Sequence, residues 1–271
     1  MRHLEPPATD AEDDAVLQTL CAQPEWALQR TSWQAAYASY RQHGGNPFAL
    51  VPQHFGPGIG KRQYDLYDSR KGSGPLAKMR RKKGLLSCPI CGSPVTGQLD
   101  HYLPRKHYPE FSIMRLNLVP ACAHCNSGVK LDTVHGVPPQ RFIHPYFDDW
   151  AGNDLWTLDI VRPLEAATFR PRAIDGLNGD RAEIVAFHLD NVLGEQFHRS
   201  MANDWSTYPS QISIRSPLTA INDVVVEVSR DLEVAIKSKG NNSWQAAFFR
   251  GLSADLNAME FVRAMAVSQL R

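Results

Sequence analysis

The chain has 271 residues, of which 43% are hydrophobic and 21% are charged, and this composition is typical of a folded globular protein. No apolar run approaches the roughly 18 residues of a membrane span, so the sequence argues against an integral membrane protein. The net charge of +1 conceals a basic middle: residues 61–130 carry 13 Lys/Arg and 4 Asp/Glu, a net charge of +9, which leaves −8 for the rest. This asymmetry indicates an acidic ligand, most naturally nucleic acid.

Residues 1–77 are predicted to form an N-terminal region that is partly disordered and then helical. The first 15 residues are acidic and have no apolar period, so we expect neither a secretory signal nor regular structure there. From Glu25 to Gln42 apolar residues recur at helical spacing, and a shorter helix is predicted around Tyr64 and Tyr67.

Residues 136–271 are predicted to form a C-terminal domain that begins as α+β and becomes helical. Three strands are expected, at Leu155–Val161, Ala167–Arg172 and Arg181–Leu189. Helices are expected after them, and Ser243 is a candidate N-cap for one of these helices.

Four of the five cysteines lie in residues 78–135, where they form two C-x2-C pairs. The pairs are Cys88 with Cys91, and Cys122 with Cys125. This spacing is typical of a structural zinc site, in which four thiolates fill the coordination shell and leave no position for a reactive water. Because no export signal is visible, zinc is favoured over disulfides and a cytoplasmic location is expected. Cys21 is expected to be a buried core thiol.

A second set of polar residues is interleaved with the cysteine pairs. Asp100 and His101 end a predicted strand, Asn117 begins a second short strand, and Asn126 opens a predicted helix that Gly128 weakens. The order of elements is therefore strand, long loop, strand, helix. These residue types indicate a second site, distinct from the cysteine site, with a catalytic role.

The segment Cys88–Lys130 resembles an HNH nuclease module, the ββα-metal fold, although Asn126 stands where many members have histidine. The resemblance implies that His101 is the general base, that Asp100 and Asn126 ligate one Mg²⁺ or Mn²⁺, and that Asn117 pins the loop and orients His101. A hard cation prefers carboxylate and amide oxygens, and an imidazole can accept a proton at neutral pH. The implied reaction is phosphodiester hydrolysis that leaves a 5′-phosphate and a 3′-hydroxyl.

The expected fold class is accordingly α+β. A zinc-stabilised ββα-metal module, residues 78–135, would be flanked by a helical N-terminal region and a mostly helical C-terminal region with a few strands. In a narrower sense, Leu99–Ser112 and Asn117–Cys122 are similar to the HNH subunit of Septu anti-phage systems. That similarity implies a nuclease effector that works beside an ABC/SMC-type ATPase, with the C-terminal region as the place for docking.

Basic residues near the predicted site are candidate contacts to nucleic acid, with DNA favoured over RNA. They are Lys78, Arg80, Arg81, Lys82, Lys83, Arg105, Lys106 and Lys130. Two alternatives remain open. A non-catalytic zinc-dependent nucleic-acid-binding module needs the cysteines and the basic run but has no need for Asp100, His101 and Asn126. A stand-alone restriction-like HNH nuclease would use the same chemistry without a partner.

Overall fold

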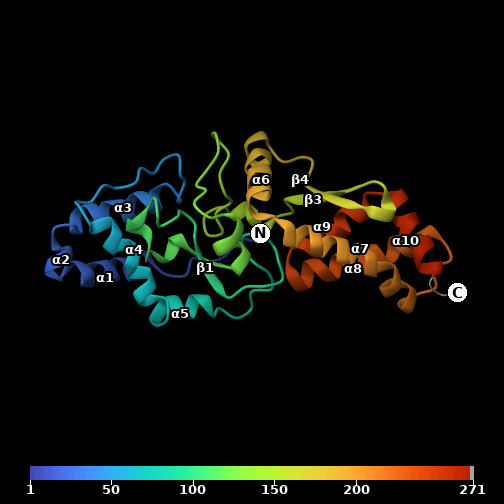
Figure 1. Ribbon diagram of the computed structural model, residues 1–271, viewed down its shortest axis with the longest axis horizontal. Helices are drawn as coiled ribbons and strands as arrows, with labels where there is room; N and C mark the ends of the chain where they lie inside the picture. Colours follow the sequence, from blue (N-terminus) through green and yellow to red (C-terminus); the bar gives the residue numbers. More distant parts are fainter. Residues whose placement is uncertain (269–271) are drawn as a thin grey trace. The chain divides into compact units, whose positions relative to one another are not determined.

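The computed structural model describes residues 1–268, which form two compact units (Figure 1). The N-terminal unit consists of His3–Leu85 and Val95–Ala151. The C-terminal unit consists of Met1–Arg2, Leu86–Pro94 and the chain from Gly152 onward. This division differs from the predicted regions 1–77, 78–135 and 136–271, because the first cysteine pair belongs to one unit and the Asp-His segment to the other.

Five α-helices belong to the N-terminal unit. They are α1 (Asp10–Cys21), α2 (Pro24–Ala27), α3 (Arg30–Gln42), α4 (Ile59–Arg70) and α5 (Gly74–Arg80). The helical spacing from Glu25 to Gln42 is confirmed as α2 and α3, and the helix predicted around Tyr64 is confirmed as α4. Cys21 is fully buried, as expected of a core thiol.

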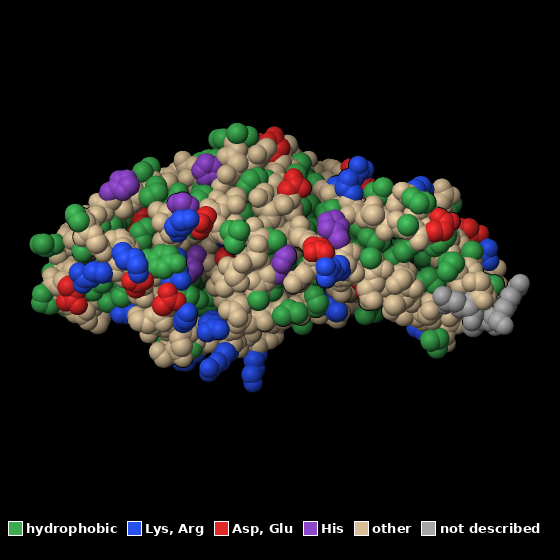
Figure 2. All heavy atoms as spheres, viewed as in Figure 1, with side chains coloured by type: hydrophobic (Ala, Val, Ile, Leu, Met, Phe, Trp, Pro, Cys, Tyr) green, Lys and Arg blue, Asp and Glu red, His purple; other side chains and the backbone are tan. Residues whose placement is uncertain are grey.

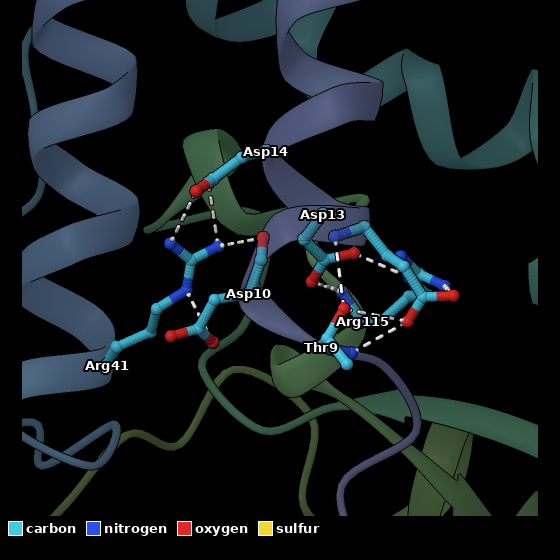
Figure 3. A network of polar contacts seen from close by, with 7 residues as sticks. Thr9, Asp10, Asp13, Asp14, Arg41 and Arg115 are labelled. Atoms are coloured by element: carbon cyan, nitrogen blue, oxygen red, sulfur yellow. Dashed lines mark hydrogen bonds and ion pairs between the residues drawn. The ribbon is translucent and has the colours of Figure 1, made fainter.

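Helix α1 corrects the prediction of a disordered acidic N-terminus. Thr9 and Glu12 form a capping box at its start. The buried carboxylate of Asp13 lies 2.6 Å from Nε of Arg115 and also accepts the Arg115 backbone N–H at 3.0 Å. Asp14 pairs with Arg41 of α3 at 2.8 Å (Figure 3). The acidic residues that lacked an apolar period are therefore held by ion pairs, which a search for hydrophobic periodicity does not detect.

The predicted strand, loop, strand order is confirmed in the N-terminal unit. β1 (Gln98–His101) pairs antiparallel with β2 (Leu118–Ala121), with Asp100 opposite Val119. The loop between the strands contains two short 3-10 helices, η1 (Pro109–Phe111) and η2 (Arg115–Asn117). The helix expected after β2 is only a five-residue π-helix, η3 (Cys125–Val129), which contains the weakening Gly128.

The C-terminal unit combines a β-hairpin with five helices. The hairpin is β3 (Trp156–Val161) and β4 (Thr168–Ala173), joined through η5 (Leu164–Ala166). The α-helices among its described residues are α6 (Gly179–Val192), α7 (Glu195–Arg215), α8 (Ile221–Lys239), α9 (Trp244–Ser253) and α10 (Leu256–Ser268). A short 3-10 helix, η4 (Asp149–Gly152), lies at the chain boundary between the two units. Ser243 caps α9 as predicted, because its hydroxyl accepts the Ala246 N–H.

The third predicted strand, Arg181–Leu189, is wrong, since these residues belong to α6. Asn178 caps this helix by accepting the Arg181 N–H at 2.9 Å. The buried residues of α6 lie at helical rather than alternating spacing; they are Ile184, Val185, His188, Leu189 and Val192. Across residues 1–268, no helix is both long and apolar enough to cross a membrane.

Candidate active site and metal centre

The four paired cysteines form a buried cluster. The Sγ atoms of Cys88, Cys91, Cys122 and Cys125 lie within 4.8 Å of one another. Cys125 N–H points at Cys122 Sγ, 3.4 Å away, as expected for a turn that presents two thiolates to one centre. The cluster could hold a metal ion, and its sulfur-only donor set fits a soft or borderline metal such as zinc.

The turn that carries the first cysteine pair requires glycine at position 92. Gly92 has φ +81°, and its N–H donates to the Cys88 carbonyl at 2.9 Å. A Cβ atom at this position would lie 2.2 Å from the backbone oxygen of Asn242. The indole of Trp244 donates to the Cys91 carbonyl at 2.8 Å. The start of α9 therefore packs directly against this turn within the C-terminal unit.

Three of the four predicted catalytic residues line a single cavity in the N-terminal unit. Asp100, His101 and Asn126 contribute to a cavity of about 510 Å³. The remaining wall residues come mainly from α4, α5 and the loop after β1; they include Tyr64, Tyr67, Asp68, Lys71, Arg80, Arg105 and Lys106. Residues from both strand β1 and helix η3 thus meet at one concave surface.

His101 is held in a defined tautomer. Its Nε2 lies 2.9 Å from the carbonyl oxygen of Ser112. Because a carbonyl can only accept, Nε2 carries the proton and Nδ1 is the basic nitrogen. The ring also packs edge-on against Tyr67, with centroids 4.6 Å apart. Burial lowers the pKa of His101 to about 3, so the imidazole is neutral at physiological pH.

Asp100 is buried beside a lysine. The ammonium of Lys130 lies 3.0 Å from Asp100 Oδ2 at an angle that does not give a well-aligned hydrogen bond, and the same nitrogen donates to the His101 carbonyl at 2.6 Å. Burial raises the pKa of Asp100. Asp100 and Asn126 line the same cavity, and carboxylate and amide oxygens are donors that fit a hard divalent cation.

Asn117 does not line the cavity, and its side chain joins the two ends of the loop between the strands. Its Oδ1 accepts the Leu103 N–H at 2.8 Å, and its Nδ2 donates to the carbonyls of Leu103 at 3.0 Å and Phe111 at 3.3 Å. The hydroxyl of Tyr40 lies 3.1 Å from Oδ1 and 3.0 Å from His144 Nε2. This fully buried network fixes the loop that carries Ser112.

The predicted nucleic-acid contacts occupy three different environments. Arg80, Arg105 and Lys106 line the cavity. Arg105 is already engaged, because its guanidinium stacks 3.9 Å from the Tyr64 ring centroid and pairs with Asp68. Lys130, by contrast, is buried and its ammonium is held by protein oxygens, so the expectation of a phosphate contact there does not fit its position.

The basic run beside the cavity is solvent-accessible. Four of its members have exposed side chains on or just after α5: Lys78, Arg81, Lys82 and Lys83. Figure 2 shows Lys and Arg side chains gathered at the edge of the molecule where Figure 1 places α5. Arg80, which precedes three of them, lines the cavity and so connects the run to the site.

Several residues that shape the site were not found from the sequence. Ser112 acts through its backbone carbonyl, which leaves no side-chain signal. Tyr67 and Tyr40 were assigned to helices, and nothing in helical periodicity distinguishes a ring that contacts His101 or Asn117 from an ordinary core residue. His144 forms its hydrogen bond to Tyr40 within the N-terminal unit, and a contact between residues so far apart in the chain leaves no local sequence signal.

No family model matches the chain, and no solved structure gives a significant match. The chain is 49% identical over 67 residues to Protein ea31 of Escherichia phage lambda. That alignment covers 22% of this chain and 21% of the phage protein, so the chain spans about a fifth of the length of its curated relative.

Proposed function

We propose that the protein is a metal-dependent HNH endonuclease that hydrolyses phosphodiester bonds in nucleic acid, with DNA favoured over RNA by charge and motif. The observation that carries the proposal is the convergence of Asp100, His101 and Asn126 on one cavity, with the proton of His101 fixed on Nε2. A purely nucleic-acid-binding module has no need for a neutral imidazole that lines the same cavity as Asp100 and Asn126.

In the proposed mechanism, Nδ1 of His101 takes a proton from the attacking water. Ser112 holds the ring through its carbonyl, and Asn117 fixes the loop that positions Ser112. A phosphate that enters the cavity brings negative charge next to the imidazole and raises its pKa from the low value of the empty site, which favours proton transfer. Asp100 and Asn126 would hold a Mg²⁺ or Mn²⁺ ion, which would supply neutralisation of the negative charge that develops on the scissile phosphate.

The cysteine cluster has a separate role in this proposal, which is to bind zinc and hold the module folded. Replacing one thiolate, as in Cys88→Ser, should lower the zinc content below one ion per chain and reduce thermal stability, because metal binding contributes to folding. Zinc is measured by atomic emission on the purified protein. A Cys88→Ser variant with full zinc content and unchanged stability would contradict this role.

The decisive test of the catalytic proposal compares two histidine variants. His101→Ala should lower the rate of DNA cleavage in Mg²⁺ or Mn²⁺ by about 10²–10⁴-fold, the usual contribution of a general base, while zinc content and folding stay intact. His54→Ala is the matched control, since His54 is exposed in the loop before α4 and is absent from the cavity wall. Cleavage by His101→Ala at the wild-type rate would remove the assigned base.

We also propose that this nuclease is the effector of a cytoplasmic anti-phage defence system and works with an ABC/SMC-type ATPase. The support is the sequence similarity to the HNH subunit of Septu systems, with the exposed basic run beside the cavity as the path for DNA. Affinity purification from cells that express the neighbouring genes should recover an ATPase with the protein. Full cleavage and full phage protection by this protein alone would favour a stand-alone nuclease.

A further inference from the structure

Lys130 is a fully buried lysine in the centre of the candidate active site. Its side chain is 1% exposed. The ammonium lies 3.0 Å from Asp100 Oδ2, donates to the His101 carbonyl at 2.6 Å, and sits 5.3 Å from the Phe142 ring centroid. A charged amine is costly to bury, and it is found in protein interiors only when it is paired. The position therefore points to a specific role for this charge.

The partner of Lys130 is one of the two residues proposed to hold the divalent ion. A cation within hydrogen-bonding distance of Asp100 compensates the buried carboxylate when no metal is bound. The same positive charge repels a divalent ion that approaches the same oxygen, and Coulomb repulsion over a few ångströms remains substantial even at an effective dielectric constant near 20. The Lys130 ammonium thus stabilises the metal-free site and also opposes binding of the divalent ion.

We infer that Lys130 is a built-in counter-ion that holds Asp100 in place without metal, and that it competes with the divalent ion for this carboxylate. This inference rests on the proposed metal site and adds a control on metal affinity to it. Lys130 is a positioning residue here, because it acts through Asp100 and the backbone of His101. The inferred competition predicts that the divalent ion binds more weakly than it would to Asp100 and Asn126 alone.

The test measures Mn²⁺ binding by electron paramagnetic resonance, together with thermal unfolding, on zinc-loaded full-length protein. Lys130→Met keeps an unbranched side chain, shorter by the terminal nitrogen, and removes the charge. Its Kd for Mn²⁺ should tighten by about tenfold or more. Without Mn²⁺ its Tm should fall by about 10 °C, because a buried carboxylate loses its partner, and Mn²⁺ should restore most of that loss.

Two further variants separate the counter-ion role from simple damage to packing. Asp100→Asn combined with Lys130→Met removes both charges, so Tm without metal should recover toward the wild-type value while Mn²⁺ binding is lost. Lys61→Met is the matched control, because Lys61 makes an exposed ion pair with Asp65 in the same unit. It should leave the Mn²⁺ affinity unchanged and shift Tm by no more than about 2 °C.

The outcomes distinguish this inference from the proposed function. If wild-type protein cleaves DNA and binds Mn²⁺ but Lys130→Met binds it no more tightly, the competition is overturned and the nuclease proposal stands. If the double variant is as unstable as Lys130→Met, the counter-ion role is overturned. If wild-type protein neither cleaves nor binds Mn²⁺, the nuclease proposal fails, whereas tight Mn²⁺ binding by Lys130→Met alone would still support exclusion of metal by the ammonium.

Discussion

Replacing Asn117 should lower the stability of the N-terminal unit far more than replacing an exposed asparagine would. In Asn117→Ala, the Leu103 N–H loses its only acceptor in a fully buried position, and the carbonyls of Leu103 and Phe111 each lose a donor. An orphaned buried N–H costs about 1–3 kcal/mol and each further lost hydrogen bond about 1 kcal/mol. The expected loss in the free energy of unfolding is therefore about 3–5 kcal/mol.

Urea denaturation followed by circular dichroism measures this loss. Asn46→Ala provides the control, because Asn46 makes a single local bond to the Phe48 N–H and should cost about 1 kcal/mol or less. Asn117→Asp keeps the acceptor but turns a second carboxylate oxygen toward the Leu103 carbonyl, so it should be at least as unstable at pH 8. A loss below about 1 kcal/mol for Asn117→Ala would refute the view that these hydrogen bonds fix the loop.

Two other predictions follow from buried groups elsewhere. Burial raises the pKa of Glu110 from 4.5 to about 7, so the folded protein binds this proton more tightly than the unfolded chain, and stability should fall by about 3 kcal/mol as the pH rises through that window. Glu110→Gln should remove this slope in urea denaturation between pH 5 and 8, and parallel profiles for the two proteins would contradict it. Gly92→Ala should lower Tm and zinc content, because its Cβ would lie 2.2 Å from the Asn242 carbonyl oxygen. Gly176→Ala also has a positive φ but no atom within 4 Å of the new Cβ, so it should show only the smaller backbone cost, and equal losses for both would exclude the steric explanation.

The parts of the site that the sequence predicted are those encoded by side-chain type and short spacing. The two C-x2-C pairs predicted a cluster that the structure contains. Asp100 and His101 at a strand end, followed by Asn126 at a helix start, predicted elements whose side chains share one cavity. These signals are local, because a few residues fix both the chemistry and the element on which it lies.

The parts that were missed depend on contacts between distant segments. Lys130 was assigned to phosphate because an unpaired lysine is normally exposed, and only the fold shows that Asp100 lies beside it. The acidic start of α1 was assigned to disorder because its order comes from a pair between Asp13 and Arg115, about a hundred residues apart. Arg181–Leu189 was assigned to a strand because its short apolar run fits either period, and the Asn178 cap decides for a helix.

The hydrogen bonds around Asn117 also bear on whether the cysteine-bracketed segment can be transferred to another protein. Tyr40 precedes residues 78–135 in the chain and His144 follows them, yet both side chains contact each other at the loop that supports the imidazole. A fragment cut to the cysteine-bracketed stretch would leave that loop without its outer supports. The cysteine-bracketed segment is therefore not structurally independent. Transferring it to another protein would require α3 and the segment around His144 as well.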